Sequence, residues 1–576
     1  MRRFAALYGE LDATTATAAK VAALVRYFAQ APSEDAAWAV YFLAGGRPRQ
    51  TVPTALLRAT ACREAGLADW LFEECYQAVG DLAETIAHVL PPAPQVSDLG
   101  LAAWVGQRLL PLRGQAPEHV GEQLALWWRE LDWAGRFLLT KLIGGGFRVG
   151  VSKLLVQRAL AEHAGLDPKR VAERMMGYTD ARALPTAARY EQLLARGDEP
   201  ATAADTGQPY PFFLAHALDL PPQEFEPRLG PVGDWLVEWK YDGIRAQIVK
   251  RAGQVWIWSR GEELVTERFP EVTAQAQAWP DGSVLDGELL VWQAQRPGSF
   301  ALLQQRIGRK TLTKKLLAEV PVVFIAYDLL EHEGHDLRAR PQHERRAALL
   351  GLAAGVTAGV TASAALQVSP EVEAADWPAL AALRAQARER GVEGLMLKHR
   401  QAAYGAGRTK AEGTWWKWKI EPMSVDCVLI YAQAGHGRRA SVYTDYTFAV
   451  WNRTPADAAE AQAVVAAIER REPARPGALQ LVPFAKAYSG LSDAEFQDVD
   501  RVIRATTLES FGPVRSVKPT LVFELGFEGI NRSARHKSGL AVRFPRMRRL
   551  RPDKPLHEAD TLGQLEALLG QGEGKS

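Results

Sequence analysis

Apolar residues recur at intervals of three and four through the first third of the chain. This spacing puts them on one face of an α-helix, whereas strict alternation would put them on one face of a strand. The spacing is clearest in four segments, residues 17–28, 66–90, 122–143 and 152–164. Few alternating runs occur before residue 195, so the pattern predicts a helical region.

From Trp235 onward the hydrophobic pattern changes to that of strands. Short runs rich in β-branched and aromatic residues are separated by glycine or charged turns, which predicts strands. These runs cover residues 236–249, 255–260, 283–292, 322–330, 425–431, 441–451 and 521–530. Helical patterns interrupt them at residues 300–309, 342–352, 378–390 and 454–470. A mixed α/β region followed by a smaller β-rich region is therefore expected.

Two stretches carry neither pattern. Residues 196–211 are rich in Gly, Pro, Ala and Asp and are the best candidate for a linker. The chain ends in GQGEGKS, which predicts a polar, frayed tail. The fold class expected is multidomain, with α, α/β and β parts. The expected boundaries are a helical domain at 1–205, an α/β domain at 206–422, a β-rich domain at 423–560 and a tail at 561–576.

The bulk composition fits a multidomain protein of the cytoplasm. A chain of 576 residues is too long for a single hydrophobic core. No run of about 18 apolar residues occurs, which argues against a membrane span, and Glu10 and Asp12 interrupt any signal-peptide core. The three cysteines suit a reducing compartment and cannot build a four-cysteine zinc site.

The net charge of +2 does not by itself indicate a nucleic-acid partner, but the charged residues are unevenly distributed along the chain. Between Arg532 and Lys554 there are nine Lys and Arg residues against one acid, Asp553. Such a run is either a solvated face or a binding site for a polyanion. Phe544 and Leu550 are interleaved with the cations, which favours a folded segment over a disordered tail.

The segment from Glu238 to Arg245, EWKYDGIR, carries the sharpest chemistry. Lys240 stands at a strand end, before Asp242 and Gly243 and near the cation of Arg245. Desolvation and a neighbouring cation both favour the neutral amine, which is the nucleophilic form of lysine. Taken alone, the tetrapeptide is more often a hairpin turn with a surface lysine.

Five later segments change that interpretation. Each adds a cation, a carboxylate or an aromatic residue at the end or along the face of a predicted strand. They contain, in order, Arg260 in SRGE, Glu288 in LDGE, Tyr327 in FIAYD, Glu393 in EGLMLK, and Lys417 with Lys419 in WWKWK. Each has an ordinary structural reading of its own, as a surface carboxylate, a core tyrosine or a solvated strand face.

Together these segments resemble the ordered motifs of the covalent nucleotidyltransferase superfamily. Within it the chain is similar to the ATP-dependent DNA ligases, particularly bacterial and archaeal forms with an N-terminal DNA-binding domain. The matches extend from Glu238 to the RFPR and RPDK segments that begin at Arg543 and end at Lys554. The turn LIGGGFRVGVS, residues 142–152, resembles the turn of ligase DNA-binding domains that lies against duplex backbone. The resemblance implies a helical DNA-binding domain, an adenylation domain and a C-terminal OB-fold.

The resemblance also implies how ATP is used. Lys240 would attack the α-phosphate and carry AMP, which then passes to the 5′-phosphate of a nick before the 3′-hydroxyl displaces it. Glu238 would read the adenine amino group, and Tyr327, where many relatives have Phe, would stack on the base. Lys417 and Lys419 would bind the α-phosphate. The other implied ATP contacts are Arg245, Arg260, Glu288, Arg408 and Arg543, and Arg408 is the least secure of them because the interval to Lys417 is long.

Metal and DNA contacts follow from the same resemblance. Glu288 and Glu393 would lie around Mg²⁺, for which Mn²⁺ is a possible substitute, since hard cations prefer oxygen ligands. Asp242 would support a later step by placing metal or the nick. Arg148, Ser152 and Lys153 would contact nicked duplex DNA through a glycine-rich turn at a helix start. A monomer associated with the nucleoid is expected.

Three alternatives stay open at this point. An RNA ligase or a capping-type enzyme would share the motifs but generally lacks a large helical domain before the nucleophile. An NAD-dependent DNA ligase would need the four-cysteine zinc module. A catalytically silent DNA-binding protein would have no reason to keep Lys240, Glu288, Glu393, Lys417 and Lys419. Replication, repair and recombination place the same demands on these residues, so the sequence does not identify the pathway.

Overall fold

The computed structural model describes the chain except for residues 49–51, 145–148, 181–183, 196–206, 310–311, 358–365, 409, 411–413, 436–441, 476, 489 and 573–576. The chain divides into two compact units. Unit 1 comprises Met1–Thr54, Pro94–Gln123 and Arg129–Ile420, and unit 2 comprises Ala55–Ala93, Leu124–Trp128 and Glu421–Ser576. In the part of the chain described, no helix is both long and apolar enough to cross a membrane. The domain boundaries stay predictions, and the linker predicted at 196–211 lies mostly outside the described residues.

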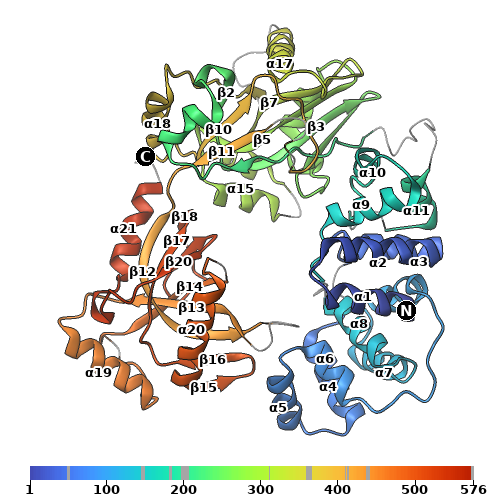
Figure 1. Cartoon of the computed structure of the whole chain (residues 1–576), viewed down its shortest axis with the longest axis vertical. Helices are drawn as coiled ribbons and strands as arrows, with labels where there is room; N and C mark the ends of the chain where they lie inside the picture. Colours follow the sequence, from blue (N-terminus) through green and yellow to red (C-terminus); the bar gives the residue numbers. More distant parts are fainter. Residues whose placement is uncertain are drawn as a thin grey trace. The chain divides into compact units, whose positions relative to one another are not determined.

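The predicted helical region is confirmed. Its α-helices are α1 (Arg2–Ala13), α2 (Thr17–Gln30), α3 (Ser33–Leu43), α4 (Thr54–Ala65), α5 (Asp69–Val79), α6 (Leu82–Val89), α7 (Pro117–Trp128), α8 (Trp133–Gly144), α9 (Lys153–Ala164), α10 (Pro168–Arg174) and α11 (Ala187–Leu194). A π-helical turn occupies Ala103–Leu109. Within unit 1, α2 packs against α9 (Figure 1).

Two of the long helical patterns are each divided into two helices by local backbone chemistry. In the segment 66–90, Gly80 ends α5 in the left-handed conformation, at a φ of 79°. The side chain of Asp81 then accepts the N–H of Glu84 and starts α6. In the segment 122–143, Asp132 accepts the N–H of Gly135 at 2.8 Å, at the start of α8. Periodicity alone does not show such breaks, because the apolar spacing continues across them.

Unit 1 also contains two sheets (Figure 1). The first has the order β1 (His216–Ala217), β11 (Trp415–Lys419), β10 (Gly394–His399) and β2 (Trp235–Trp239). The second has the order β4 (Gln254–Ser259), β3 (Ile244–Arg251), β5 (Ser283–Gln293), β7 (Val322–His332) and β8 (His335–Asp336), with β6 (Arg296–Pro297) on β5 and β9 (Leu366–Val368) parallel to β7. The helices that accompany the two sheets are α13 (Phe225–Leu229), α14 (Pro270–Ala276), α15 (Phe300–Ile307), α16 (Lys314–Glu319), α17 (Gln342–Thr357) and α18 (Trp377–Ala385).

The central strand β5 shows how the second sheet positions functional residues. Leu285 and Leu289 are fully buried in the core that α14, α15 and α17 share with the sheet. Because successive side chains of a strand point to opposite faces, Asp286 and Glu288 lie on the other face. The helices therefore cover one side of the sheet, and the carboxylates are presented on the opposite side.

Unit 2 is built around one antiparallel sheet. Its order is β14 (Leu481–Ala487), β13 (Tyr443–Trp451), β12 (Met423–Ala434), β16 (Val514–Val517) and β15 (Thr507–Phe511), and β17 (Val522–Phe527) pairs with both β12 and β20 (Arg546–Leu550). A separate pair joins β18 (Gly529–Arg532) to β19 (Leu540–Arg543). After residue 421 its helices are α19 (Ala458–Glu469), α20 (Asp493–Thr506) and α21 (Leu562–Gly572), and α4, α5 and α6 also fall in this unit.

The predicted polar tail is wrong for most of its length. Residues 562–572 form α21, and Leu565 and Leu569 of this helix are buried in the core of unit 2. The two leucines are one helical turn apart, so they lie on one face and anchor an otherwise polar segment. The helix α20 was also not predicted, although Ser492 and Glu495 form a capping box at its start.

Candidate active site

The site is centred on Lys240, which directly follows β2. Its backbone N–H donates to the carbonyl of Gly394 at 2.8 Å, and its own carbonyl accepts the N–H of Glu393 at 2.7 Å. The two predicted motifs are thus held together by their backbones. Gly394 has a φ of 136°, and a β-carbon there would overlap the carbonyl oxygen of Trp418 on β11. Only glycine permits this close approach of β10 and β11.

The side chains of the same residues form a cluster of alternating charge. The ammonium of Lys240 contacts the carboxylate of Glu393, and Lys419 approaches the same Oε2 at 3.4 Å. The side chains of Lys240 and Lys419 are 22% and 30% exposed, so the cluster is accessible from solvent. One carboxylate therefore lies between two cations at an open face, and the cations can bind an incoming anion.

Glu288 adds a second carboxyl group with unusual acidity. It lies on β5 opposite Arg245 of β3. Burial raises the pKa of Glu288 to about 7; the cations of Lys240 and Arg245 oppose this rise, and the negative charges of Glu393 and Asp242 add to it. Two carboxyl groups that share a site resist simultaneous ionisation. An added cation would relieve this repulsion.

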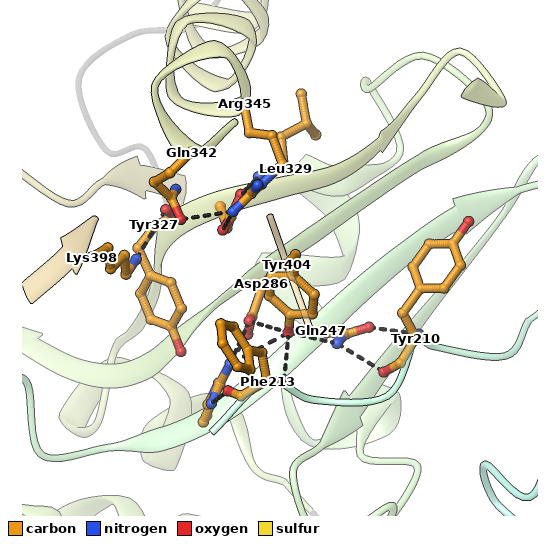
Figure 2. Close-up of polar contacts among 12 residues, drawn as sticks. Tyr210, Phe213, Gln247, Asp286, Tyr327, Leu329, Gln342, Arg345, Lys398 and Tyr404 are labelled. Atoms are coloured by element: carbon orange, nitrogen blue, oxygen red, sulfur yellow. Dashed lines mark hydrogen bonds and ion pairs between the residues drawn. The ribbon is translucent and has the colours of Figure 1, made fainter. Parts of the chain in front are cut away.

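A second, more enclosed cluster surrounds Glu238. This carboxylate, only 2% exposed, is bound by Lys398 at 2.6 Å and by Arg346 at 3.3 Å. Lys398 also lies over the ring of Tyr327, 4.3 Å from its centroid (Figure 2). It lies 4.6 Å from the ring centroid of Trp415. Tyr327 and Glu238, which were both predicted to bind the adenine base, therefore contact the same residue, Lys398. Neither Lys398 nor Arg346 was assigned a role from the sequence.

The guanidinium of Arg245, which the sequence predicted to contact ATP, binds groups of the protein in this structure. Its guanidinium pairs with Asp286 on the neighbouring strand, with Nη2 and Oδ2 2.7 Å apart, and donates to the carbonyl of Phe213 at 2.6 Å. The hydroxyl of Tyr404 donates to the same carboxylate at 2.7 Å (Figure 2). Ion pairing with Asp286 raises the pKa of Arg245 against the opposing effect of burial. Most of its donors thus bind protein acceptors, and its role as an ATP contact stays a prediction.

A fully buried ion pair supports β7, which carries Tyr327. Arg345 of α17 binds both oxygens of Asp328, at 2.8 and 2.9 Å, and neither side chain is exposed. Its Nη1 donates to the carbonyl of Ala402 at 3.1 Å. Its Nη2, which also binds Asp328, donates to the side chain of Gln342 at 2.7 Å (Figure 2). This arrangement joins the helix layer to the strand at the residue next to Tyr327.

The other predicted site residues come from several segments of the chain. Lys417 lies on β11 opposite Met396, and Asp242 lies between β2 and β3. Arg260 and Arg408 are exposed in connecting segments. Arg543 belongs to unit 2, where its guanidinium lies 4.8 Å from the ring centroid of Phe544. The roles given to these residues stay predictions.

The predicted DNA contacts have mixed outcomes. Arg148 lies outside the described residues. Ser152 caps α9, because its hydroxyl accepts the N–H of Leu155 at 3.3 Å. Lys153 forms an ion pair with Glu262 and donates to the carbonyl of Met175 at 3.2 Å. Its charge is therefore used within unit 1.

No group of three or more metal-binding side chains occurs among the described residues. Glu288 and Glu393 are nonetheless two interacting carboxyl groups: burial raises the pKa of Glu288, and the negative charge of Glu393 raises it further. Mg²⁺ typically takes one or two protein carboxylates and completes its coordination with substrate phosphates and water. The residues present fit a metal ion that arrives with a phosphate ligand.

The paired sheets, the carboxylate of Glu393 between two lysines and the buried Glu238 joined to an aromatic ring through Lys398 fit the nucleotidyltransferase class that the sequence motifs resemble. Comparison with known families identifies it further. Residues 223–419 match the family described as "ATP dependent DNA ligase domain", and residues 1–161 match "DNA ligase N terminus". The chain belongs to the ATP-dependent DNA ligase family.

Individual relatives agree with this assignment. A probable DNA ligase from Koribacter versatilis is 32% identical over 97% of this chain and 94% of its own length. Another from Opitutus terrae is 30% identical over 99% of this chain, which spans 62% of that protein. The solved structure titled "Pmar-Lig_PreS3" is similar with a TM-score of 0.57 at 15% identity, covering 95% of this chain and 99% of that one. At that identity the last comparison supports the fold alone.

Proposed function

We propose that this DNA ligase works through a covalent lysyl-AMP, with Lys240 as the nucleophile. The Nζ of Lys240 attacks the α-phosphorus of ATP, a P–N bond forms, the P–O bond to pyrophosphate breaks and the amine loses a proton. The observation that carries this proposal is the contact of the Lys240 ammonium with Glu393, beside Lys419. Glu393 is positioned to take the proton, and Lys419 to stabilise charge that develops on the phosphate oxygens.

Two further transfers complete nick sealing. The 5′-phosphate of the nick displaces Lys240 from AMP, which gives an adenylated DNA end. The 3′-hydroxyl then attacks the 5′-phosphate, a phosphodiester forms and AMP leaves. Lys417, on the same face of β11 as Lys419, would serve the phosphate in each transfer, because side chains two residues apart share a face.

Base recognition falls to the enclosed cluster. Glu238 would accept a hydrogen bond from the adenine amino group, and Tyr327 would stack on the base. The ion pairs with Lys398 and Arg346 hold the Glu238 carboxylate in place before ATP binds, so little ordering is needed on binding. Glu288 and Glu393 would hold Mg²⁺, which would neutralise phosphate charge when bound.

We assign the remaining functions by domain. The helical region would bind duplex DNA, and the sheet of unit 2 would be the OB-fold of the family. The continuous pairing of β12 with β13, β16 and β17 supports this, because one long strand shared among several partners is how small barrels close. DNA would be held mainly through its backbone, so binding should weaken with salt and show little sequence preference.

Mass spectrometry of the full chain after incubation with ATP and Mg²⁺ tests the proposal. An added AMP is expected, and it is expected to be lost in Lys240→Ala but kept in Lys315→Ala, a matched change at an exposed lysine. Parallel incubation with NAD and sealing assays with nicked DNA and nicked RNA test the alternatives. Absence of an adduct on the wild-type chain, or its persistence in Lys240→Ala, would contradict the mechanism.

A further inference from the structure

The basic run between Arg532 and Lys554 divides into two parts that differ in how their charges are used. In the second part the cations are paired. Arg551 and Lys554 bind Asp426 at 2.9 and 2.6 Å, and Arg548 and Arg549 bind Glu524 at 3.3 and 2.8 Å. These four charges are largely neutralised within unit 2, so they contribute little long-range field.

Elsewhere in the run, Arg532 lies 3.8 Å from Glu566, and three exposed cations form no ion pair among the described residues: Arg535, Lys537 and Arg546. Arg535 and Lys537 are exposed in the turn that joins β18 to β19, on either side of His536. Over the described residues, no acidic side chain lies within ion-pairing distance of either cation. Two unneutralised charges two residues apart give this turn a positive local potential.

The turn is also well ordered. The N–H of Ser533 donates to the carbonyl of Gly539 at 2.7 Å, and the N–H of Gly539 donates to the carbonyl of His536 at 3.0 Å. The hydroxyl of Ser538 is buried and bonds to the backbone of Leu540. At the base of the hairpin, Ile530 and Leu540 are buried in the unit 2 core. The cations are thus held outward on a fixed support, which lowers the entropy lost when a ligand binds.

We propose that this turn, residues 533–539 and hereafter the basic turn, binds the phosphate backbone of duplex DNA. Arg535 and Lys537 would each contact a phosphate. The inference rests on the DNA-sealing function and adds a contact surface to it. It does not depend on whether Lys240 is the nucleophile.

The test is the salt dependence of binding of the full chain to a nicked DNA duplex. The 3′ end at the nick is a dideoxynucleotide and the buffer contains EDTA, so that the nick is not sealed during the measurement. Each phosphate contact contributes about −0.9 to the slope of log K against log salt. In the double variant Arg535→Gln/Lys537→Gln the slope should become shallower by about 1.8, and binding near 0.1 M salt should weaken on the order of 10-fold or more.

A matched double variant, Arg470→Gln/Arg471→Gln, removes two exposed cations of unit 2 that are paired with Glu472 and Glu509. It should leave the slope unchanged. The proposal is overturned if the two double variants behave alike, or if the basic-turn variant keeps the wild-type slope. It is also overturned if that variant loses AMP-adduct formation in the absence of DNA, because the turn would then act on ATP. Retained adduct formation with weakened DNA binding is the expected result.

Discussion

Two charged clusters of unit 1 use the same residue types in opposite ways. Around Arg345 and Asp328 every group is enclosed: both side chains are fully buried, the carboxylate is bound bidentately, and the spare donors meet Ala402 and Gln342. Around Lys240 the charges are open: Glu393 contacts two partly exposed lysines, and the pKa of Glu288 is raised to about 7.

The difference shows which pairs build the framework and which are reserved for a ligand. A buried pair that satisfies all its donors has no capacity for another partner, and its loss leaves a stranded charge. An open cluster with surplus carboxyl and ammonium groups is less stable by itself and gains stability when phosphate and metal arrive. Substitutions in the first cluster should therefore reduce stability, and substitutions in the second should reduce activity.

The largest effect is expected from Lys240→Arg. Arginine keeps the cation beside Glu393 but cannot act as a nucleophile at neutral pH. Sealing of a nicked duplex should fall by at least about 10⁴-fold, as when a nucleophile is removed from other enzymes. The urea midpoint should stay close to that of the wild type. Comparable sealing by the variant would mean that the open cluster is not the reaction centre.

The next largest effect is the reverse pattern in Asp328→Ala. Removal of this carboxylate strands the buried guanidinium of Arg345, which should lower the free energy of unfolding of unit 1 by about 3–5 kcal/mol. Urea unfolding followed by tryptophan fluorescence measures it. The control is Asp498→Asn, which breaks an exposed pair with Arg501 and should cost less than about 1 kcal/mol. Equal losses of stability in the two variants would contradict the conclusion that the buried Arg345–Asp328 pair is part of the structural framework.

The residues of the open cluster around Lys240 were largely predicted from the sequence. The buried ion pairs of Arg345 with Asp328 and of Lys398 with Glu238 were not. Lys240, Glu393, Lys417 and Lys419 stand in ordered motifs at strand ends, where alternation fixes which face each side chain occupies. The partners of Arg345 and Lys398 come from elements distant in the chain, and no local pattern signals which cation meets which acid. The same limit explains Arg245, whose motif suggested ATP but whose donors are held by Asp286.

The prediction of where helices begin and end failed for a different reason, because single residues decide these points. Gly80 divides a continuous helical pattern because its left-handed backbone ends α5. The polar residues at the end of the chain obscured the leucines of α21, of which Leu565 and Leu569 are buried in the core of unit 2 and Leu562 and Leu568 pack against it. In both places a few residues outweigh the average composition of the segment.

A moderate effect is expected from Glu288→Gln, through pH. Because the folded-state pKa is raised from 4.5 to about 7, the folded protein binds more protons than the unfolded chain between these values. Stability should therefore fall as pH rises from about 4.5 to about 7 and then level off. Glutamine removes the charge, so the variant should lack this decline and be more stable at pH 8 by about 1–3 kcal/mol. Thermal unfolding across this pH range, with Glu319→Gln at an exposed position as control, measures it. An unchanged pH profile would place Glu288 outside the open cluster.

The smallest effect is expected from Tyr327→Phe. The ring receives the ammonium of Lys398 and, in the proposed function, would stack on the base; both interactions use the aromatic face, which phenylalanine keeps. Burial raises the pKa of Tyr327 well above its ordinary value, so the hydroxyl that is lost is neutral and removes no charge. The KM for ATP in adduct formation should change less than about fivefold, within about 1 kcal/mol. In Tyr327→Ala the ring is lost and the KM should rise much further. If both variants weakened ATP use equally, the hydroxyl rather than the ring would be the contact, and the base would have to lie against a different wall of the enclosed cluster.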